Sequence, residues 1–482
     1  MKTLTTVMIF LSMHLCMAQQ KRPNIIFILA DDLGWTDTGA YGSKYHETPH
    51  IDKLANQGIK LMRHHHCQNC QPTRAALMSG QYGARTGVYT VGGINRFDWS
   101  ARPLRPAENQ MAPKLELKTV ADALKQSGYS TAMFGKWHLG EGKGFHPADR
   151  GFQEAIVTDG KHFDFRTNPK TGYPKGQYLA DFLTDRAVDF IQRKKDLPFF
   201  LYLPHFGVHS PWDSLPEDEK HFVEKKPVGG HGNPTYAGMI YAVDRSVGRI
   251  MALLDELKLA ENTVIIFSSD NGGVGGYDRP DGLIRDPGIL PKNQSNDVTD
   301  NAPLRSGKGS LYEGGTRVPF IVRWPGIVKA ATTCDAPSTH VDLFPTLLEI
   351  SSTPKPEQVL DGESLVPLLK EPAASLQRTA IFQHFPGYLG RGKGEWRTTP
   401  VSTIQSGNWK LMEFLEDKKI ELYNLKDDIG ETQNLAEKNA EKVAELIKVL
   451  NDWRTETKAP MPTPHQASPK NPDKKPKKKN SK

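Results

Sequence analysis

The sequence predicts an α/β fold with a large, doubly wound, mostly parallel sheet flanked by helices, and a smaller C-terminal α+β domain of antiparallel sheet plus helix. Short apolar runs of β-branched and aromatic residues alternate with stretches of helical periodicity, which is typical of a buried parallel sheet with crossover helices. The 482 residues exceed one small core and predict two or three compact units. Hydrophobic residues form 37% of the chain and charged residues 24%, which is typical of a globular protein and excludes a disordered or fibrous one.

Four apolar runs supply the predicted strands, and each leads into polar residues. The runs are 24–30, 130–138, 198–203 and 263–269, and the polar residues that end or follow them are Asp31, Asp32, Lys136, His138, His209, Asp270 and Asn271. Because the ligand site of an open α/β sheet lies beyond the carboxyl ends of its strands, we expect these side chains to meet in one crevice. Residues 114–127 and 179–195 have helical apolar spacing, and right-handed crossovers would place helices on both faces of the sheet.

The C-terminal part of the chain has a different pattern. Residues 408–415 and 419–425 predict two antiparallel strands, and a helix is expected near 436–454, with the apolar stripe Val443, Leu446, Ile447, Leu450 and Trp453. A Pro-rich stretch separates this part from the large sheet. We therefore predict a large domain at 19–375 and a small α+β domain at 376–457.

Residues 1–18 predict a cleaved signal peptide. Lys2 precedes an apolar stretch that ends in the small residue Ala18, which is the usual order of a secretory signal. The stretch is shorter than the about 20 residues of a spanning helix. Leu15 also stands where a small residue should precede a lipid-bearing Cys16. We therefore expect a secreted or periplasmic protein with no membrane insertion.

Residues 458–482 account for the positive charge of the chain. The net charge is +7, and this segment contains eight lysines and one aspartate, so that the rest of the chain sums to zero. The charge belongs to this segment and predicts no nucleic-acid partner. A Pro- and Lys-rich segment with almost no apolar residues predicts a disordered tail.

Removal of the signal peptide leaves three cysteines, Cys67, Cys70 and Cys334. Three are too few for a disulfide-stapled scaffold, and an odd number in an oxidising compartment indicates that at least one has a fate other than pairing.

Cys70 opens the segment CQPTRAALMSG, which is similar to the sulfatase signature C-x-P-S-R followed by x-x-x-L-T-G. Thr73, Met78 and Ser79 replace the serine, leucine and threonine of that signature. The segments PNIIFILADDLG, GYSTAMFGKWHLG, VHSP, FSSDNGG and NAPLRSGKGSLYEGGTRVPFIVRWPG match the same family in order, and the likeness extends through LYNLKDDIGETQNLA. The chain thus resembles the formylglycine-dependent (type I) sulfatases, the arylsulfatase-like members of the alkaline phosphatase superfamily.

The resemblance implies an enzyme that hydrolyses sulfate esters, with sulfated carbohydrate as the expected substrate. A maturation enzyme would convert Cys70 to formylglycine, whose hydrate is the nucleophile. The implied metal ligands are Asp31, Asp32, Asp270, Asn271 and the formylglycine at position 70. An all-oxygen set suits Ca²⁺ or Mg²⁺ and not zinc, and calcium is the commoner ion in the family. Taken alone, Asp31 and Asp32 would be explained equally well as helix caps.

The resemblance also assigns roles to basic residues that stabilise developing negative charge. Arg74 and Lys136 would hold and polarise the formylglycine. His138 would assist the removal of a proton, and Lys308 would bind sulfate. Either His209 or Lys308 would protonate the leaving oxygen, and we favour His209 because an imidazole titrates near the working pH.

Two other functions stay open as alternatives. A phosphodiesterase or phosphonate hydrolase of the same superfamily would share much of this chemistry, but the segment GKGSLYEGG favours a sulfatase. A non-catalytic protein that binds sulfated glycans would not need the full set of metal and basic residues. The run His64–His66 could suggest a metal site, yet neighbours on an extended chain point to opposite faces, so local packing or an electropositive rim is favoured. Glu313, Arg317 and Trp324 are expected to give structural support.

Overall fold

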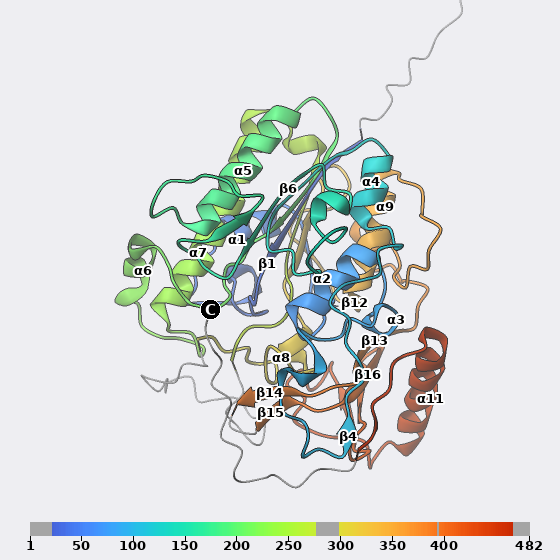
Figure 1. Cartoon of the computed structure of the whole chain (residues 1–482). Coiled ribbons are helices and arrows are strands. Elements are labelled where there is room, and N and C mark those ends of the chain that lie inside the picture. Colours follow the sequence, from blue (N-terminus) through green and yellow to red (C-terminus); the bar gives the residue numbers. More distant parts are fainter. Residues whose placement is uncertain (1–21, 276–297, 393–394, 466–482) are drawn as a thin grey trace, which may run out of the picture.

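The computed structural model describes residues 22–275, 298–392 and 395–465, and its main feature is one large sheet (Figure 1). The sheet has nine strands in the order β11-β2-β10-β9-β1-β8-β5-β6-β7. Their bounds are β1 Asn24–Ala30, β2 Ile59–Leu61, β5 Ser130–Gly135, β6 Glu154–Asp159, β7 Arg166–Asn168, β8 Phe199–Pro204, β9 Thr263–Ser269, β10 Phe320–Arg323 and β11 Thr332–Cys334.

The five central strands run parallel. β1 pairs in parallel with β8 and β9, and β5 pairs in parallel with β8 and β6. β10 is antiparallel to β9 and β2, and β7 is antiparallel to β6. The prediction of a mostly parallel sheet is therefore confirmed, with antiparallel neighbours towards both edges.

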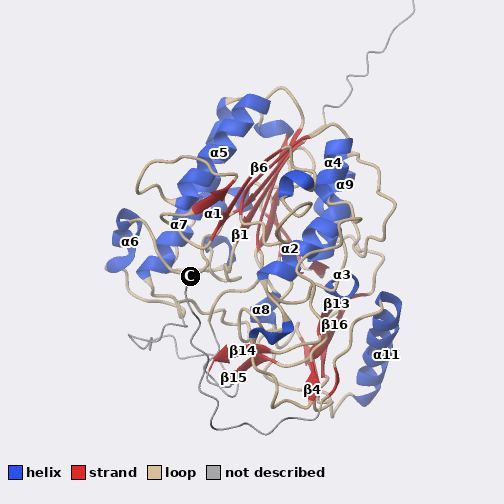
Figure 2. Ribbon diagram, in the orientation of Figure 1, coloured by secondary structure: helices blue, strands red, loops and turns tan. Residues whose placement is uncertain are grey.

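Helices cover both faces of the sheet, which confirms the doubly wound arrangement (Figures 1 and 2). Successive side chains of a strand point to opposite faces, so Ile26 and Ile28 pack on one side and Ile25 and Phe27 on the other. The first side holds α1 Pro49–Asn56, α5 Leu179–Lys194 and α7 Pro234–Glu256. The second holds α2 Cys70–Ser79, α4 Val120–Gln126, α9 Leu343–Ser351 and α10 Val366–Lys370.

Two predicted helices can be compared with the structure directly. The stretch 179–195 forms α5 almost as expected. The stretch 114–127 does not form a helix over its whole length, because α4 begins only at Val120. The Thr119 hydroxyl accepts from the backbone N–H of Asp122 and the Asp122 carboxylate accepts from that of Thr119, a capping box that starts the helix at this point.

The C-terminal unit is an antiparallel sheet covered by one helix, as predicted. Its order is β13-β16-β17-β18, with β13 Ala380–Phe385, β16 Val401–Ser406, β17 Trp409–Phe414 and β18 Ile420–Asn424. The helix α11 Ala440–Thr457 packs Leu446, Leu450 and Trp453 against this sheet. Tyr82 and Val341 belong to the same apolar cluster, so the core of the small sheet continues into the large unit.

Short elements complete the described chain. They are α3 Gly83–Thr86, α6 Pro216–Val223, α8 Glu313–Thr316, and the strand pairs β12 Ser338–Thr339 with β3 His64–His65, β14 Leu389–Gly392 with β15 Glu395–Thr398, and β19 Thr463–Pro464 with β4 Leu104–Arg105. No helix among the described residues is long and apolar enough to cross a bilayer.

The pair of β19 with β4 corrects one prediction. β19 lies inside 458–482, the range predicted to be a disordered tail, and the backbone N–H of His465 donates to the Pro103 carbonyl at 2.7 Å. Amino-acid composition does not predict this strand, because β4, the strand that stabilises it, lies far away in the sequence. The predicted signal peptide, residues 1–18, and residues 466–482 lie outside the described part of the chain.

Candidate active site

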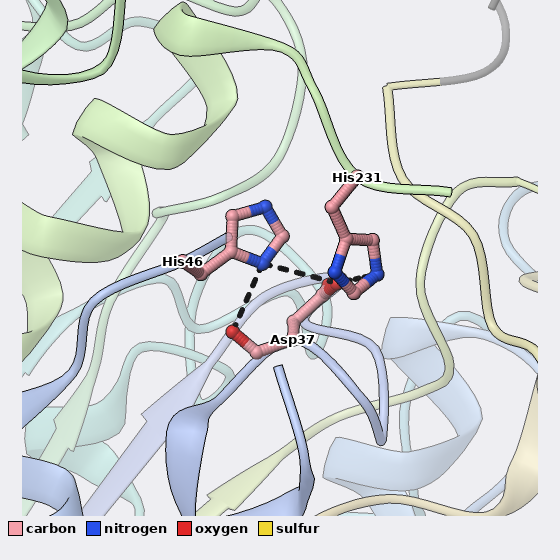
Figure 3. A group of neighbouring side chains, drawn as sticks. All are labelled: Asp37, His46 and His231. Atoms are coloured by element: carbon pink, nitrogen blue, oxygen red, sulfur yellow. Dashed lines mark hydrogen bonds and ion pairs between the residues drawn. The ribbon is translucent and has the colours of Figure 1, made fainter. Parts of the chain in front are cut away.

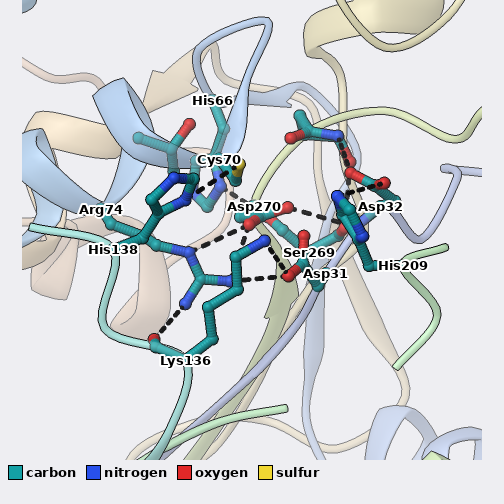
Figure 4. Close-up of polar contacts among 12 residues, drawn as sticks. Asp31, Asp32, His66, Cys70, Arg74, Lys136, His138, His209, Ser269 and Asp270 are labelled. Carbon is teal, nitrogen blue, oxygen red and sulfur yellow. Dashed lines mark hydrogen bonds and ion pairs between the residues drawn. The ribbon is translucent and has the colours of Figure 1, made fainter. Parts of the chain in front are cut away.

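The site lies where the central parallel strands end. The register aligns Leu29 of β1 with Pro204 of β8, and Ala30 of β1 with Ser269 of β9. Asp31 and Asp32 therefore emerge beside Asp270 and Asn271, and Lys136, His138 and His209 follow the ends of β5 and β8 (Figure 4). The structure thus brings the residues predicted from the strand ends into one crevice.

Cys70 enters this crevice from the opposite direction, as the first residue of α2. Its side chain is buried, and its Sγ lies 3.4 Å from Nδ1 of His138. The start of a helix presents free N–H groups and the positive end of the helix dipole, so position 70 is suited to a group that develops negative charge. No disulfide forms among the described residues, since Cys67, Cys70 and Cys334 are all free.

Arg74 lies one turn further along α2 and connects the two sides of the crevice. Its Nε and Nη2 both donate to Oδ2 of Asp270, at 3.1 and 2.7 Å, and its Nη1 donates to the Lys136 carbonyl at 2.7 Å. Arg74 is almost completely buried, so these contacts hold it in one orientation.

Each of the two lysines is paired with a different aspartate. Lys136 Nζ donates to Oδ2 of Asp31, and Lys308 Nζ donates to Oδ2 of Asp32 at 2.6 Å. Lys308 follows no strand of the large sheet, yet it reaches the same crevice as the strand-end residues.

The acidic residues leave oxygen atoms without partners. Oδ1 of Asp31 and Oδ1 of Asn271 are buried and accept no hydrogen bond from any described residue. A buried acceptor without a donor costs about 1 to 3 kcal/mol, which a bound cation would offset. Asp31, Cys70 and Asp270 also offer ligand atoms within 4.8 Å of one another. The carboxylate and amide oxygens of this set fit the hard divalent cation predicted from the sequence.

The charges of these carboxylates are strongly coupled. Burial opposes ionisation of Asp31, but Lys136 and its basic neighbours hold the pKa of this carboxyl well below its usual range. Burial also opposes ionisation of Asp32, but Lys308, His209 and Lys136 together lower its pKa. For Asp270, burial and the charge of Asp31 raise the pKa well above its usual value despite Arg74. Three carboxylates packed this closely favour a cation among them.

Two residues of the crevice have left-handed backbone conformations. Asp32 has φ 68° and His138 has φ 61°, in the region that favours glycine. Such a conformation in a non-glycine residue costs on the order of 1 kcal/mol and persists only where the surroundings enforce it. His138 contacts Cys70, and Asp32 is one of the crevice carboxylates and accepts from Lys308. The strained backbone therefore lies at residues of the candidate active site.

Both histidines of the crevice are neutral at neutral pH. Burial, Lys136 and Arg74 lower the pKa of His138 to about 3. Burial and Lys308 lower the pKa of His209 to about 4. His209 contacts the Ser210 carbonyl through Nδ1 at 2.5 Å, and its Nε2 lies 3.7 Å from Oδ2 of Asp32. From the sequence, His209 is favoured over Lys308 as the acid because an imidazole usually titrates near the working pH. That expectation is wrong for the buried His209.

A cavity of about 1040 Å³ opens beside Lys136, His138 and Phe206. Its wall includes polar and aromatic side chains that sequence analysis did not identify, among them Gln71, Trp137, His146, Arg166 and Asn168. Gln71 and Trp137 lie within motifs of the sequence that gave them no role, whereas His146, Arg166 and Asn168 lie in segments without a recognisable motif. Only the folded loops bring these side chains to the reactive residues. The cavity is large enough for a substrate of several rings.

The three consecutive histidines form separate packing contacts, as expected. His64 contacts Oγ of Ser338 at 2.8 Å, and His66 contacts the Ser269 carbonyl at 2.6 Å. His65 Nε2 lies 2.9 Å from Oε2 of Glu313, a buried carboxylate that also accepts from Lys410. Their three ring contacts lead in three directions, so they share no common ligand position.

Comparison with known proteins supports this arrangement. The sequence profile of the family described as Sulfatase matches residues 23–352, and the profile described as N-sulphoglucosamine sulphohydrolase, C-terminal, matches residues 307–458. A sulfatase of Formosa agariphila is 33% identical over 528 aligned positions that cover 91% of this chain and 90% of that protein. An N-acetylgalactosamine-6-O-sulfatase of Bacteroides thetaiotaomicron is 29% identical, with 90% of this chain and 94% of the relative covered.

A solved structure shares the fold of this chain. The crystal structure of Ps i-CgsB in complex with k-i-k-neocarrahexaose superposes with a TM-score of 0.74 at 28% identity and covers 91% of this chain and 94% of that one. The profile match extends from β1 to α9 and so includes every residue of the crevice described above. This chain belongs to the sulfatase family and is a sulfuric ester hydrolase by that membership.

Proposed function

We propose that this protein removes sulfate from sulfated saccharides with a formylglycine at position 70 and one divalent cation, calcium or magnesium. The observation that carries the proposal is the position of Cys70. It is buried at the start of α2, 3.4 Å from a neutral imidazole, and its Sγ lies within 4.8 Å of carboxylate oxygens of Asp31 and Asp270. A cysteine kept only for packing would not need these neighbours.

The cation would be held by Asp31, Asp32, Asp270 and Asn271. When bound, cation and hydrated formylglycine together supply a polarised oxygen nucleophile towards sulfur. The protein's own residues do the remaining work. Arg74 orients Asp270 through two hydrogen bonds, and Lys136 holds Asp31.

Proton transfer falls to the residues around position 70. His138 has a pKa lowered to about 3, so its imidazole is free to accept a proton from the group at position 70. Lys308 keeps its charge because Asp32 raises its pKa against the effect of burial, and it can attract the sulfate oxygens. The proton for the leaving oxygen comes from His209 or from Lys308.

The saccharide substrate is supported by two lines of argument. The relatives named above include an N-acetylgalactosamine-6-O-sulfatase and a protein crystallised in complex with k-i-k-neocarrahexaose. The cavity beside Lys136 has room for more than one sugar ring, and it combines aromatic Trp137 and Phe206 with polar Gln71 and Asn168. Aromatic faces and side-chain amides suit the apolar and hydroxyl surfaces of sugars.

Residues 1–18 support a location outside the cytoplasm, secreted or periplasmic, where such polymers are met. The formylglycine-generating enzyme would be the obligatory maturation partner. Mass determination of the secreted chain tests cleavage after Ala18, and mass spectrometry of the peptide that contains position 70 tests the conversion.

The deciding experiment measures sulfate release from a panel of defined sulfated oligosaccharides, including galactosamine 6-sulfates and carrageenan fragments. Wild-type protein is compared with Cys70→Ala and Asp270→Ala, and with wild-type protein after chelation. We expect release by the untreated wild type alone. A higher kcat/KM for a phosphate ester than for its sulfate twin, across several leaving groups, would show that the family's fold performs phosphoryl chemistry here.

A further inference from the structure

A second group of possible metal ligands lies outside the crevice (Figure 3). Asp37 follows β1, His46 precedes α1, and His231 precedes α7. All three are buried, and each offers one ligand atom within 4.8 Å of the others. Figure 3 shows both imidazoles directed towards the Asp37 carboxylate.

The spacing of these atoms matches tetrahedral coordination. Oδ1 of Asp37 lies 3.4 Å from Nε2 of His231 and 3.7 Å from Nδ1 of His46. Zinc binds nitrogen and oxygen ligands at about 2.0 to 2.1 Å, which places tetrahedral ligands about 3.3 Å apart. The two ring nitrogens lie within 4.8 Å of each other, so an inward movement of the rings would complete three corners. The backbone carbonyls of Asp37 and Asp300 lie 3.1 and 2.9 Å from the ring nitrogens of His46 and His231, respectively.

Charge balance also favours a cation at this position. Asp37 is fully buried, and within the described part of the chain its ion-pair partners are His46 and His231 alone. The two rings stack at a centroid distance of 4.4 Å, and Oδ1 of Asp37 lies beside both. A buried carboxylate with no lysine or arginine paired to it among the described residues is costly unless hydrogen bonds or a bound cation compensate its charge.

Outer contacts hold the three groups in place. Oδ2 of Asp37 accepts from the Gly34 N–H at 2.7 Å and from the Tyr236 hydroxyl at 2.8 Å, whereas Oδ1 accepts from the Thr299 hydroxyl and faces the two histidines. Nδ1 of His231 lies 3.3 Å from Oγ of Ser43, an acceptor for the ring proton when Nε2 binds a metal.

The two histidines differ in whether the ring nitrogen that does not bind the metal has a hydrogen-bond partner. Coordination through Nδ1 would move the ring proton of His46 to Nε2, which is buried and has no hydrogen-bond partner among the described residues. His46 is therefore the weaker nitrogen ligand, and His231 the stronger one.

We propose that Asp37, His46 and His231 bind one Zn²⁺ ion at a structural site separate from the catalytic cation. Two imidazoles and one carboxylate suit zinc, whereas the all-oxygen set at Asp31 and Asp270 suits calcium or magnesium. The Tyr236 hydroxyl lies within hydrogen-bonding distance of both Asp37 and the Asp32 carbonyl, at 3.2 Å for the latter. Zinc at this position would fix the segment that leads from Asp32 to His46 against α7.

The test is the metal content of the untagged, full-length protein after expression with added zinc and exposure to a chelator. We expect about one zinc per chain in the wild type, because a buried structural ion leaves only on unfolding. Asp270→Ala should keep this zinc while losing the catalytic cation. His231→Gln should retain less than about a tenth of it and His46→Gln an intermediate amount.

His205→Gln is the matched control. His205 is as deeply buried and contacts Ser246 at 3.1 Å, but it lies outside the group, so its replacement should leave the zinc content unchanged. If His231→Gln is insoluble, wild-type protein expressed with cobalt should show the visible absorption of tetrahedral Co²⁺. Wild-type protein without zinc and without this absorption, or equal zinc in His231→Gln, would overturn the proposal.

Discussion

Single residues in the crevice act through specific pairings. Arg74 is the clearest case, because one buried guanidinium fixes Asp270 on one side and the Lys136 carbonyl on the other. His138, which contacts Cys70, and Asp32, which pairs with Lys308, add backbone strain at two positions of the crevice. Such residues tolerate little change, since a buried charge that loses its partner keeps its desolvation cost.

At this scale we predict that Arg74→Ala lowers kcat/KM for a sulfate ester about 100-fold or more, by removing a buried charge that stabilises the transition state and orients Asp270. Steady-state kinetics check this, with formylglycine content measured in parallel so that poor maturation is recognised. The control is Arg193→Ala, because Arg193 is an exposed residue of α5. A loss of less than about tenfold would contradict the role given to Arg74.

Secondary-structure elements of the two sheets are joined by buried ionic contacts. Lys410 of β17 pairs with Glu313 of α8 at 2.9 Å and with Glu431 at 2.7 Å. Glu313 also contacts His65 and Arg317, which gives structural roles to Glu313 and Arg317, as the sequence predicted. These contacts, together with the shared apolar cluster around Tyr82 and Trp453, attach the C-terminal sheet to the large one.

We expect Lys410→Met to lower the free energy of unfolding by about 3 kcal/mol, the lower end of the cost of breaking a buried pair. We expect the lower value because burial raises the pKa of Glu431 to about 7. Glu431 can therefore take up a proton when Lys410 is lost, which removes one unpaired buried charge. Denaturant unfolding at neutral pH measures the change. Lys419→Met is the matched control, at the position just before β18, since Lys419 is 57% exposed and its loss should cost less than about 0.5 kcal/mol.

The whole molecule buries several neutral histidines. Burial lowers the pKa of His205 to about 4, and the pKa of His340 is lowered to about 4 by the same cause. Unfolded histidine titrates near 6.5, so each contributes stability that is fully present above that pH and is lost as the pH falls through 4.

We therefore predict that the free energy of unfolding decreases between about pH 6.5 and 4, by up to about 3 kcal/mol for each such histidine. His205→Gln keeps a polar group next to Ser246 but cannot be protonated, and it should show a shallower decline. Guanidinium unfolding at several pH values compares the two slopes. Parallel slopes would mean that His205 does not take part.

The chain beyond α11 gives a second prediction for the whole molecule. Residues 466–482 contain seven lysines and one aspartate. Removing them should weaken low-salt association with a sulfated polymer and leave turnover of a small sulfate ester unchanged, because concentrated positive charge attracts a polyanion over about a Debye length. Binding assays at low and high salt, with kinetics on the small ester, check this.

A chain that ends at residue 457 should in addition be less stable. It would lose β19 and the Pro460 carbonyl that contacts Nε2 of the buried His384 at 2.8 Å. Equal unfolding midpoints for chains ending at 457 and 465 would show that this strand contributes nothing.

The sequence by itself determined the elements and the composition of the crevice. Period-two and period-3.6 patterns are local, so they identified four of the five parallel strands, α5, and two strands of the C-terminal sheet with its helix. Because ligand sites lie at the carboxyl ends of parallel strands, the sequence also predicted that Asp31 and Asp270 meet. The sulfatase motifs added Cys70, Arg74 and Lys308. These are properties that a chain carries in neighbouring residues.

Only the tertiary structure decided which distant groups touch and how deeply they lie. It paired Arg74 with Asp270, placed His138 beside Cys70, ordered β19 on β4, and gathered Asp37, His46 and His231. It also lowered the pKa of His209, which the sequence analysis expected near the working pH. The physical reason is that pairing and desolvation depend on distances between segments far apart in the chain, and local periodicity contains no such distances.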